Sequence, residues 1–260
     1  MTAILISESQ RLQRSSLLLT GIFAALAVAF LAMFPTMREE AEAVREAYPD
    51  YLIEMLGLEA IHLIEGFAAG YIYPFLWVLF GGMYFAYIGG GLVADDIRVR
   101  KMDLTLSNPV SRESVLAQKT AALWVPLISL NAGMLVAISG GAALIGESFE
   151  LLPLVMVHLL GLPYLLVCAG IGLVLSVTVD RPSRAQVLGL GLVFMLWLVD
   201  SISVMEPDVE WVGSFTPSRY YDPAEILVRE EYAFLDASIL LGGFVVLFGV
   251  ATFHFVRRDI

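Results

Sequence analysis

Six long apolar runs constrain this chain more than any other feature, because each is long enough to cross a membrane. A hydrocarbon core about 30 Å thick needs roughly 20 residues of α-helix at about 1.5 Å of rise per residue. Backbone amides in lipid must be bonded within the segment, and the runs lack the alternation of a β-barrel. We therefore expect an all-α fold, a single transmembrane domain over residues 1–260 with six transmembrane helices. The runs cover residues 16–35, 71–94, 120–145, 151–179, 185–205 and 237–256.

The composition excludes several classes of protein. Hydrophobic residues make up 58% of the chain and charged residues 16%, against about 45–50% and about 25% in soluble domains. This excess argues against a soluble enzyme and against a disordered tail. The net charge of −11 argues against nucleic acid as a partner, since a polyanion needs a basic face. The single cysteine, Cys168, excludes a disulfide framework and a CxxC site.

The charges are distributed unevenly between alternate loops. Eleven of the fifteen Lys and Arg residues precede the first run, follow the sixth, or lie between runs two and three or runs four and five. The loops 36–70 and 206–236 instead hold eight acidic residues each. The positive-inside rule therefore predicts a multi-pass protein of the cell membrane with both termini cytoplasmic. Only two of the bases are lysine, a bias that suggests a halophilic archaeon as the source.

Two loops on the predicted outer side contain helix patterns. Residues 49–67 place apolar side chains along one face, as in a helix that lies on the membrane surface. Farther on, Asp222, Pro223 and Glu225 occupy the N-cap, first and third positions of a helix start. We expect the region 206–236 to carry this capped helix and to pack on the membrane or dip into it.

The loop 95–119, between the second and third runs, is the most informative of the inner loops. The glycines at 89–91 end the preceding helix, and Asn108 with Pro109 marks a turn. Ser111 can cap a new helix that leads into the third run. This pattern predicts a firm surface for a cytoplasmic partner, and a solvated, charged connector is the alternative.

Motifs for known catalytic chemistry are missing from the sequence. It has no GxxxxGK[ST] phosphate loop and no GxSxG, HExxH or GxGxxG, and no two of its three histidines stand at ligand spacing. Polar residues inside membrane spans are functional candidates by default, here Asn131, His158 and Asp200. Each could line a translocation path or bridge two helices, and Asp200 could simply reach water from the end of its span. Glycines that permit close helix packing stand at 66 and 70, 140 and 141, and 189 and 191.

Two stretches resemble the membrane subunits of ABC-2 type transporters. Residues 104–112, LTLSNPVSR, followed by Lys119, are similar to the LLS-x-P-V-S-R … K stretch of that family. Residues 253–260, FHFVRRDI, are similar to its F-x-R-R-D ending. Six spans with both ends inside match the fold of the family as well. The closest similarity is to permeases that serve nitrous-oxide-reductase maturation.

The resemblance implies a permease subunit without an ATPase motif of its own, with ATP bound by a separate ATP-binding subunit on the cytoplasmic side. A second permease copy or a homologue would complete a dimer. In the family, the loop 95–119 forms the coupling region, residues 1–15 form an interfacial helix, and spans two and five line the path. The implied contacts with the ATP-binding subunit are Asp95, Asp96, Arg98, Arg100, Lys101, Pro109, Ser111 and Arg112, and the candidates for the translocation path are Asp200 and Asn131.

The chain departs from the family pattern at two places. Asp95 and Asp96 stand near a usual glutamate, so an acid that can contact the ATP-binding subunit is kept. Lys101 with Met102 replaces a usual Gly-Thr, which removes a glycine from the local turn.

The function that we expect from these observations is the membrane permease of an ATP-driven transporter. A membrane anchor or assembly factor of the same fold is the first alternative. A membrane-embedded enzyme has the least support, because it would need polar groups to converge from scattered positions. We expect no cofactor and no metal in this chain.

Overall fold

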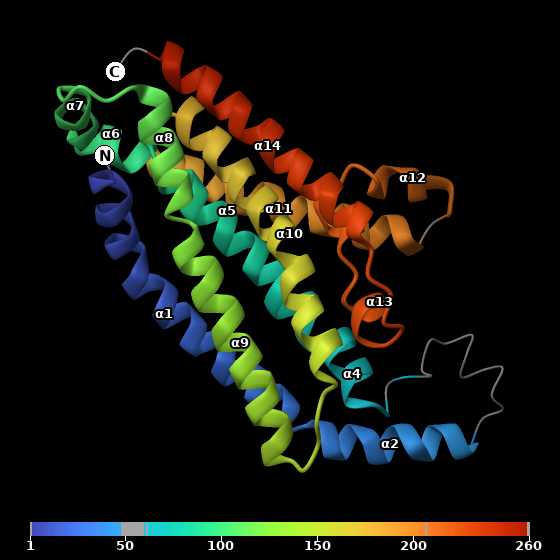
Figure 1. Cartoon of the computed structure of the whole chain (residues 1–260). Coiled ribbons are helices and arrows are strands. Elements are labelled where there is room, and N and C mark those ends of the chain that lie inside the picture. Colours follow the sequence, from blue (N-terminus) through green and yellow to red (C-terminus); the bar gives the residue numbers. More distant parts are fainter. Residues whose placement is uncertain (1, 48–59, 61, 206, 259–260) are drawn as a thin grey trace.

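Six helical stretches that are long and apolar enough to cross a membrane make up most of the structure, a computed structural model that describes residues 2–47, 60, 62–205 and 207–258 (Figure 1). The predicted all-helical fold and the number of spans are confirmed. The buried share is 78% in the second stretch and 67% in the fourth, but 17% in the fifth and sixth, so the second and fourth form the centre. The stretches are Ala3–Ala41, Ile64–Arg98, Arg112–Leu144, Leu151–Thr178, Pro182–Met205 and Phe234–Arg257.

The first span is continuous with the beginning of the chain. Helix α1 runs from Ala3 to Leu31, and α2, Phe34–Ala47, follows after a short turn. The helix runs without a break across the expected boundary between an interfacial helix at 1–15 and a span at 16–35. No glycine or proline stands between Ala3 and Ser16, so nothing interrupts the hydrogen-bond ladder. The surface helix expected at 49–67 falls mostly on residues outside the described part of the chain.

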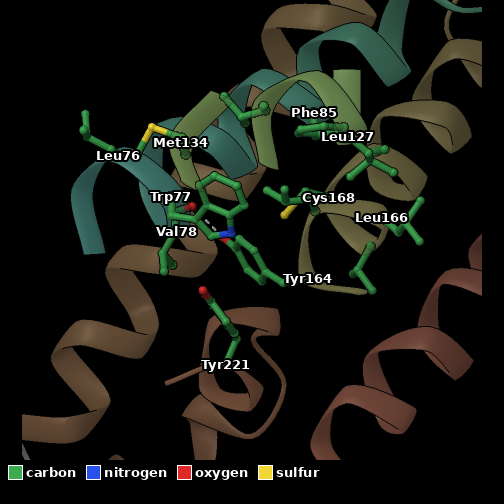
Figure 2. Close-up of a cluster of buried hydrophobic side chains, with 14 of the residues drawn as sticks. Leu76, Trp77, Val78, Phe85, Leu127, Met134, Tyr164, Leu166, Cys168 and Tyr221 are labelled. Atoms are coloured by element: carbon green, nitrogen blue, oxygen red, sulfur yellow. Dashed lines mark hydrogen bonds between the residues drawn. The ribbon is translucent and has the colours of Figure 1, made fainter. Parts of the chain in front are cut away.

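The second span begins at Ile64 rather than at 71 and combines three helical pieces. These are α4 (Ile64–Phe67), a π-helical segment (Ala68–Gly81) and α5 (Gly82–Gly91). The π-helical segment contains Pro74, which has no N–H to donate to a ladder. A residue of α10 also bonds to this segment, since the hydroxyl of Tyr164 donates to the carbonyl oxygen of Val78 at 2.7 Å (Figure 2).

The connection to the third span is a series of three short helices, α6 (Ala94–Arg98), α7 (Lys101–Leu106) and α8 (Arg112–Ala121). The predicted cap is confirmed, because the hydroxyl of Ser111 accepts the backbone N–H of Ser114 at 3.2 Å. Helix α9, Trp124–Leu144, continues α8 after a turn. Pro126 explains the turn, since proline excludes the helical bond to the carbonyl of Ala122.

The second half of the chain contains three long helices and an elaborate connection between the last two. The long helices are α10 (Leu151–Thr178), α11 (Pro182–Met205) and α14 (Phe234–Arg257). Helix α11 starts at Pro182, earlier than the expected 185, because proline is well suited to the first helical position. Between α11 and α14 lie Pro207–Val209, α12 (Glu210–Gly213), Pro217–Tyr220 and α13 (Pro223–Leu227). The predicted cap of α13 is confirmed, since Asp222 accepts the N–H groups of Ala224 and Glu225.

Three helices meet at very short range around Ala86. A Cβ added to Gly172 of α10 would lie 2.1 Å from the carbonyl oxygen of Ala86, and one added to Gly189 of α11 would lie 3.1 Å from it. A Cβ on Gly89 would lie 2.2 Å from the carbonyl oxygen of Ala169. Glycine therefore lets the backbones of α5, α10 and α11 touch, as small residues do in membrane bundles. Of the glycines singled out from the sequence, 66, 141 and 189 meet neighbours within 4 Å, whereas 70, 140 and 191 do not.

The two ends of the described chain lie at the same end of the bundle (Figure 1). The start of α1 contacts α8, where the amide N–H of Leu5 donates to Gln118 at 3.4 Å. The end of α14 also reaches α8, through Arg112. We call this the terminal end; α2 and α4 lie at the opposite end (Figure 1).

Candidate functional site

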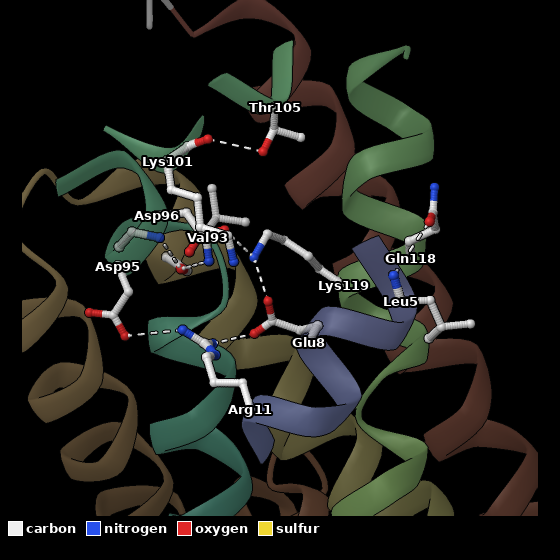
Figure 3. A network of polar contacts seen from close by, with 12 residues as sticks. Leu5, Glu8, Arg11, Val93, Asp95, Asp96, Lys101, Thr105, Gln118 and Lys119 are labelled. Atoms are coloured by element: carbon white, nitrogen blue, oxygen red, sulfur yellow. Dashed lines mark hydrogen bonds and ion pairs between the residues drawn. The ribbon is translucent and has the colours of Figure 1, made fainter. Parts of the chain in front are cut away.

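A buried cluster of three charged side chains joins three helices at the terminal end (Figure 3). The ammonium group of Lys119, on α8, lies 2.9 Å from Glu8 Oε2 of α1 and 2.6 Å from Asp96 Oδ2 of α6. The side chains of Lys119 and Glu8 are 1% exposed and that of Asp96 is 5% exposed. Burial of charges on this scale is tolerated only when each has a partner. The cluster therefore fixes α1, α6 and α8 to one another.

A partly exposed layer of charges covers this cluster. Arg11 forms an ion pair with Glu8, and its other guanidinium nitrogen lies 3.9 Å from Asp95 Oδ2. Lys101 lies 3.7 Å from Asp96. Of the two acids expected to contact an ATP-binding subunit, Asp96 is thus buried inside this chain, and Asp95 is partly engaged by Arg11. This corrects the expectation for Asp96, whose carboxylate has no open surface to offer a partner.

Helix α6 is anchored on α10 by a single hydroxyl group. Ser176 is buried, and its Oγ accepts the backbone N–H groups of Val93 and Ala94, both at 3.0 Å. Val93 occupies the N-cap position but has no side chain that can accept a hydrogen bond. Ser176 supplies that acceptor from another helix, which fixes the first turn of α6, where Asp95 and Asp96 lie.

Two arginines cap the ends of neighbouring helices at the terminal end. The guanidinium group of Arg112 donates to the carbonyl oxygens of Phe255 and Val256 at 3.1 and 3.3 Å, and also to that of Arg258. Arg258 in turn donates to the carbonyl oxygen of Val177 at 2.7 Å. Cations at helix C-termini satisfy free carbonyls and complement the helix dipole. Arg112 thus binds within its own chain, and it remains partly exposed in the groove between α7 and α8.

The exposed face of the terminal end is formed by α6, α7 and the turn that follows. The side chains of Arg98, Arg100 and Lys101 lie on it, and so does Leu104, which is 71% exposed. Pro109 and Ser111 are exposed on the turn. Two grooves flank α7, one of about 400 Å³ against the start of α1 and one of about 650 Å³ against the start of α8. We call this surface the docking face; it combines basic charge with accessible apolar side chains.

The turn between α6 and α7 has a strained backbone. Arg100 has a φ of 56° and lies in the left-handed region, which glycine adopts far more readily than other residues. The sequence has no glycine at this turn, so Arg100 itself adopts the strained conformation. Arg100 is exposed in this turn.

The intramembrane candidates Asn131 and His158 are not brought together. The amide of Asn131 donates to the carbonyl oxygen of Leu127 in its own helix at 2.7 Å. The polar link between α1 and α9 is instead made by Thr20 and Ser129, whose hydroxyl oxygens are 3.0 Å apart. His158 does bridge two helices, since its Nε2 lies 3.3 Å from the hydroxyl oxygen of Tyr73.

Asp200 lines a cavity of about 200 Å³ between α11, the π-helical segment and the approach to α13. Trp197 and Tyr221 form part of its wall, and Asn131 does not. The ring of Tyr221 stacks on Tyr164 at 5.9 Å, and both hydroxyl groups are used, that of Tyr221 by the carbonyl oxygen of Val157 (Figure 2). We call this space the Asp200 cavity. Among the described residues, no three His, Cys, Asp or Glu side chains gather as a metal site requires.

The family of the chain follows from a comparison with known protein families. Residues 5–260 match the family model described as ABC-2 family transporter protein. The chain belongs to the ABC-2 family of transporter membrane proteins. A search of curated proteins found no match. Six apolar helices and the family match together make this ABC-2 protein a multi-pass membrane component, a kind of subunit that typically has no catalytic activity of its own.

In this ABC-2 protein, the predicted contact residues separate into two groups. Arg98, Arg100, Lys101, Pro109 and Ser111 are exposed on the docking face. Asp96 is buried, and Arg112 is partly exposed but bound to the end of α14, so both hold the docking face in place. Sequence reasoning missed Glu8, Ser176 and Arg258, which complete these internal contacts. The sequence shows only that each of these polar residues stands at the edge of an apolar run. It does not show which residue each one contacts, because the partner is far away along the chain.

Proposed function

We propose that this ABC-2 protein is the permease subunit of an ATP-driven transporter, with an ATP-binding subunit bound to the docking face. The observation that carries the proposal is the combination of exposed basic and apolar side chains on the docking face. The buried charges beneath this face are already paired with one another, so the exposed side chains are the ones available to a partner. The sequence contains no phosphate-binding loop, so the ATP chemistry would belong to the partner. The distribution of basic residues supports a cytoplasmic location for this face and for both termini.

The internal contacts suggest how a movement of the partner would reach the membrane helices. The buried Glu8–Lys119–Asp96 cluster joins the docking face to α1 and α8, and Arg112 joins α8 to the end of α14. A push on α6 and α7 would therefore move several spans together rather than one loop. ATP-dependent closure can shift the permease between states only through contacts that differ between those states.

A second permease copy or a homologue would complete the transporter. The fifth span has only 17% of its most apolar window buried within this chain, so most of α11 is available to lipid or to a partner helix. Asp200 lies on this helix and lines a cavity, which supports its assignment to the translocation path over Asn131. Within the family, the stretches 104–112 and 253–260 favour the permeases that serve nitrous-oxide-reductase maturation.

Co-purification with a cognate ATP-binding subunit tests the proposed function. We expect the double variant R98E/R100E to lower recovery of the complex, because both side chains are exposed on the docking face. The matched control is R229E, which reverses an exposed charge in the loop before α14. Equal recovery from all three proteins would contradict the proposed docking face. Stimulated ATP turnover in the complex would distinguish a transporter from a membrane anchor.

A further inference from the structure

The Asp200 cavity contains one carboxylate that the chain itself does not neutralise. Asp222 also lines the cavity, but its Oδ1 accepts two backbone N–H groups, at 2.7 and 3.4 Å. Arg219, a third lining residue, is 2.6 Å from Glu210 Oε1. Asp200 Oδ1 is buried, and within the described residues it has no hydrogen-bond partner. The side chain of Asp200 as a whole is half-buried, and its carboxylate has no positive partner among the described residues.

The charges of the lining define what that partner can be. Arg219 is paired with Glu210 and Asp222 caps the start of α13, so Asp200 contributes one negative charge that no ion pair with a described residue balances. A monovalent cation balances this charge, whereas an anion would add a second uncompensated charge next to Asp200. Arg219 does not serve as this cation, because its bond to Glu210 already directs it elsewhere.

The remaining wall of the cavity is suited to an organic cation rather than to a metal ion. Trp197 and Tyr221 present aromatic rings, and Pro74 and Val78 present apolar surface. Aromatic faces attract ammonium groups, and they do so more strongly when water is excluded. A metal ion would instead need several oxygen ligands, and the described residues offer no such group of three.

The aromatic wall is already rigid without a ligand. The hydroxyl of Tyr221 donates to the carbonyl oxygen of Val157 at 2.8 Å, and its ring stacks on Tyr164 with an interplanar angle of 19°. A side chain that is fixed before binding loses little conformational entropy when the ligand arrives. This part of the cavity wall is therefore fixed before a ligand binds.

We propose that the Asp200 cavity binds a small monovalent organic cation, an ammonium group with short apolar substituents. Asp200 is the counter-ion, and Trp197 and Tyr221 form the aromatic wall. The further step, that such a cation is the transported substrate, rests on the proposed transport function. Binding itself depends only on this chain.

Calorimetric titration of the purified full-length protein in lipid nanodiscs tests this proposal. The probe is tetramethylammonium chloride, and the neutral comparison is tert-butanol, which has a similar shape without the charge. We expect saturable heat from tetramethylammonium only. D200N should weaken binding at least about tenfold, since it removes the unpaired negative charge. W197L should weaken it about fivefold through loss of the aromatic face.

Two further variants keep the result interpretable. D200E retains the charge and should retain binding, and D208N, an exposed acid that does not line the cavity, should bind as the unmodified protein does. Equal binding of both probes, equal binding by D200N, or no saturable heat in the millimolar range would overturn the proposal. Since no ATP-binding subunit is present, a failure here is separate from a failure of docking or of ATP turnover.

Discussion

The ammonium group of Lys119 lies 2.6 Å from the carboxylate of Asp96, and both side chains are buried at the terminal end of the bundle. With Glu8 on the other side of Lys119, this contact joins the start of the first span to the docking face. Asp96, which the sequence predicts as a contact on the docking face, is therefore buried beneath that face and helps to hold it in place. The exposed basic residues, rather than Asp96, are the ones available to another subunit.

Replacement of Lys119 should destabilise the protein severely. K119A leaves Glu8 and Asp96 buried without their shared counter-ion, which typically costs about 3–5 kcal/mol. We expect a large fall in the thermal unfolding temperature in detergent and poor recovery of folded protein. The matched control is K101A, since Lys101 is 45% exposed and lies 3.7 Å from Asp96, and exposed pairs contribute about 0–1 kcal/mol. Similar losses for the two variants would contradict the role given to the buried cluster.

Gly172 should not tolerate even a methyl group. In G172A the new Cβ would lie 2.1 Å from the carbonyl oxygen of Ala86, so α5 and α10 must separate. Overpacking of this kind costs about 1–3 kcal/mol. The same substitution at Gly191 meets no atom within 4 Å and serves as the control. Thermal unfolding of both variants measures the difference, and an equal response would argue against the close contact of the two helices.

Glycine at position 100 should stabilise the turn between α6 and α7. The φ of 56° strains any residue with a Cβ, and relief of left-handed strain is worth about 1–2 kcal/mol. R100G should therefore unfold at a higher temperature than R100A, although both remove the same charge. If Arg100 also contacts the ATP-binding subunit, both variants should bind that subunit less well. A lower unfolding temperature for R100G than for R100A would contradict the strained conformation.

The stability of the region around α13 should depend on pH through Glu225. Burial, and next the charge of Asp222, raises the pKa of Glu225 above its ordinary value. At a pH between the ordinary and the raised pKa, Glu225 is protonated in the folded protein but ionised in the unfolded chain. The contribution of Glu225 to folding stability is therefore most favourable below the ordinary pKa. That contribution is lost as the pH rises through the raised pKa of the folded state. E225Q should flatten this dependence in unfolding experiments between acidic and neutral pH, whereas E113Q, at the terminal end, should leave it unchanged.

Local sequence patterns were sufficient to predict the six spans and the two helix caps. The apolar runs have the length that a bilayer requires, and Ser111 and Asp222 stand directly before the helices they cap. Contacts between distant residues could not be predicted in this way. Glu8 and Lys119 are separated by 111 positions, and neither residue indicates its partner. The halophilic source suggested by the composition stays a prediction.

The glycines illustrate the same limit at the level of helix packing. A pair of glycines such as 189 and 191 indicates that a close approach is possible, but only 189 meets another helix. Gly89 and Gly172 make very short contacts with Ala169 and Ala86, yet nothing in the sequence indicates these partners. Which face of a helix meets a neighbour depends on the arrangement of the whole bundle.

The most direct test of the central claim is a cysteine cross-link from Leu104 to the ATP-binding subunit. The only native cysteine, Cys168, is buried, so the C168A/L104C protein carries one reactive thiol on the docking face. We predict a cross-linked heterodimer in membranes that contain both subunits, and labelling of this thiol only from the cytoplasmic side. The control is C168A/W211C, whose thiol lies on the exposed α12 and should be labelled from the other side without a cross-link. Cross-linking through position 211 but not through 104 would contradict the account.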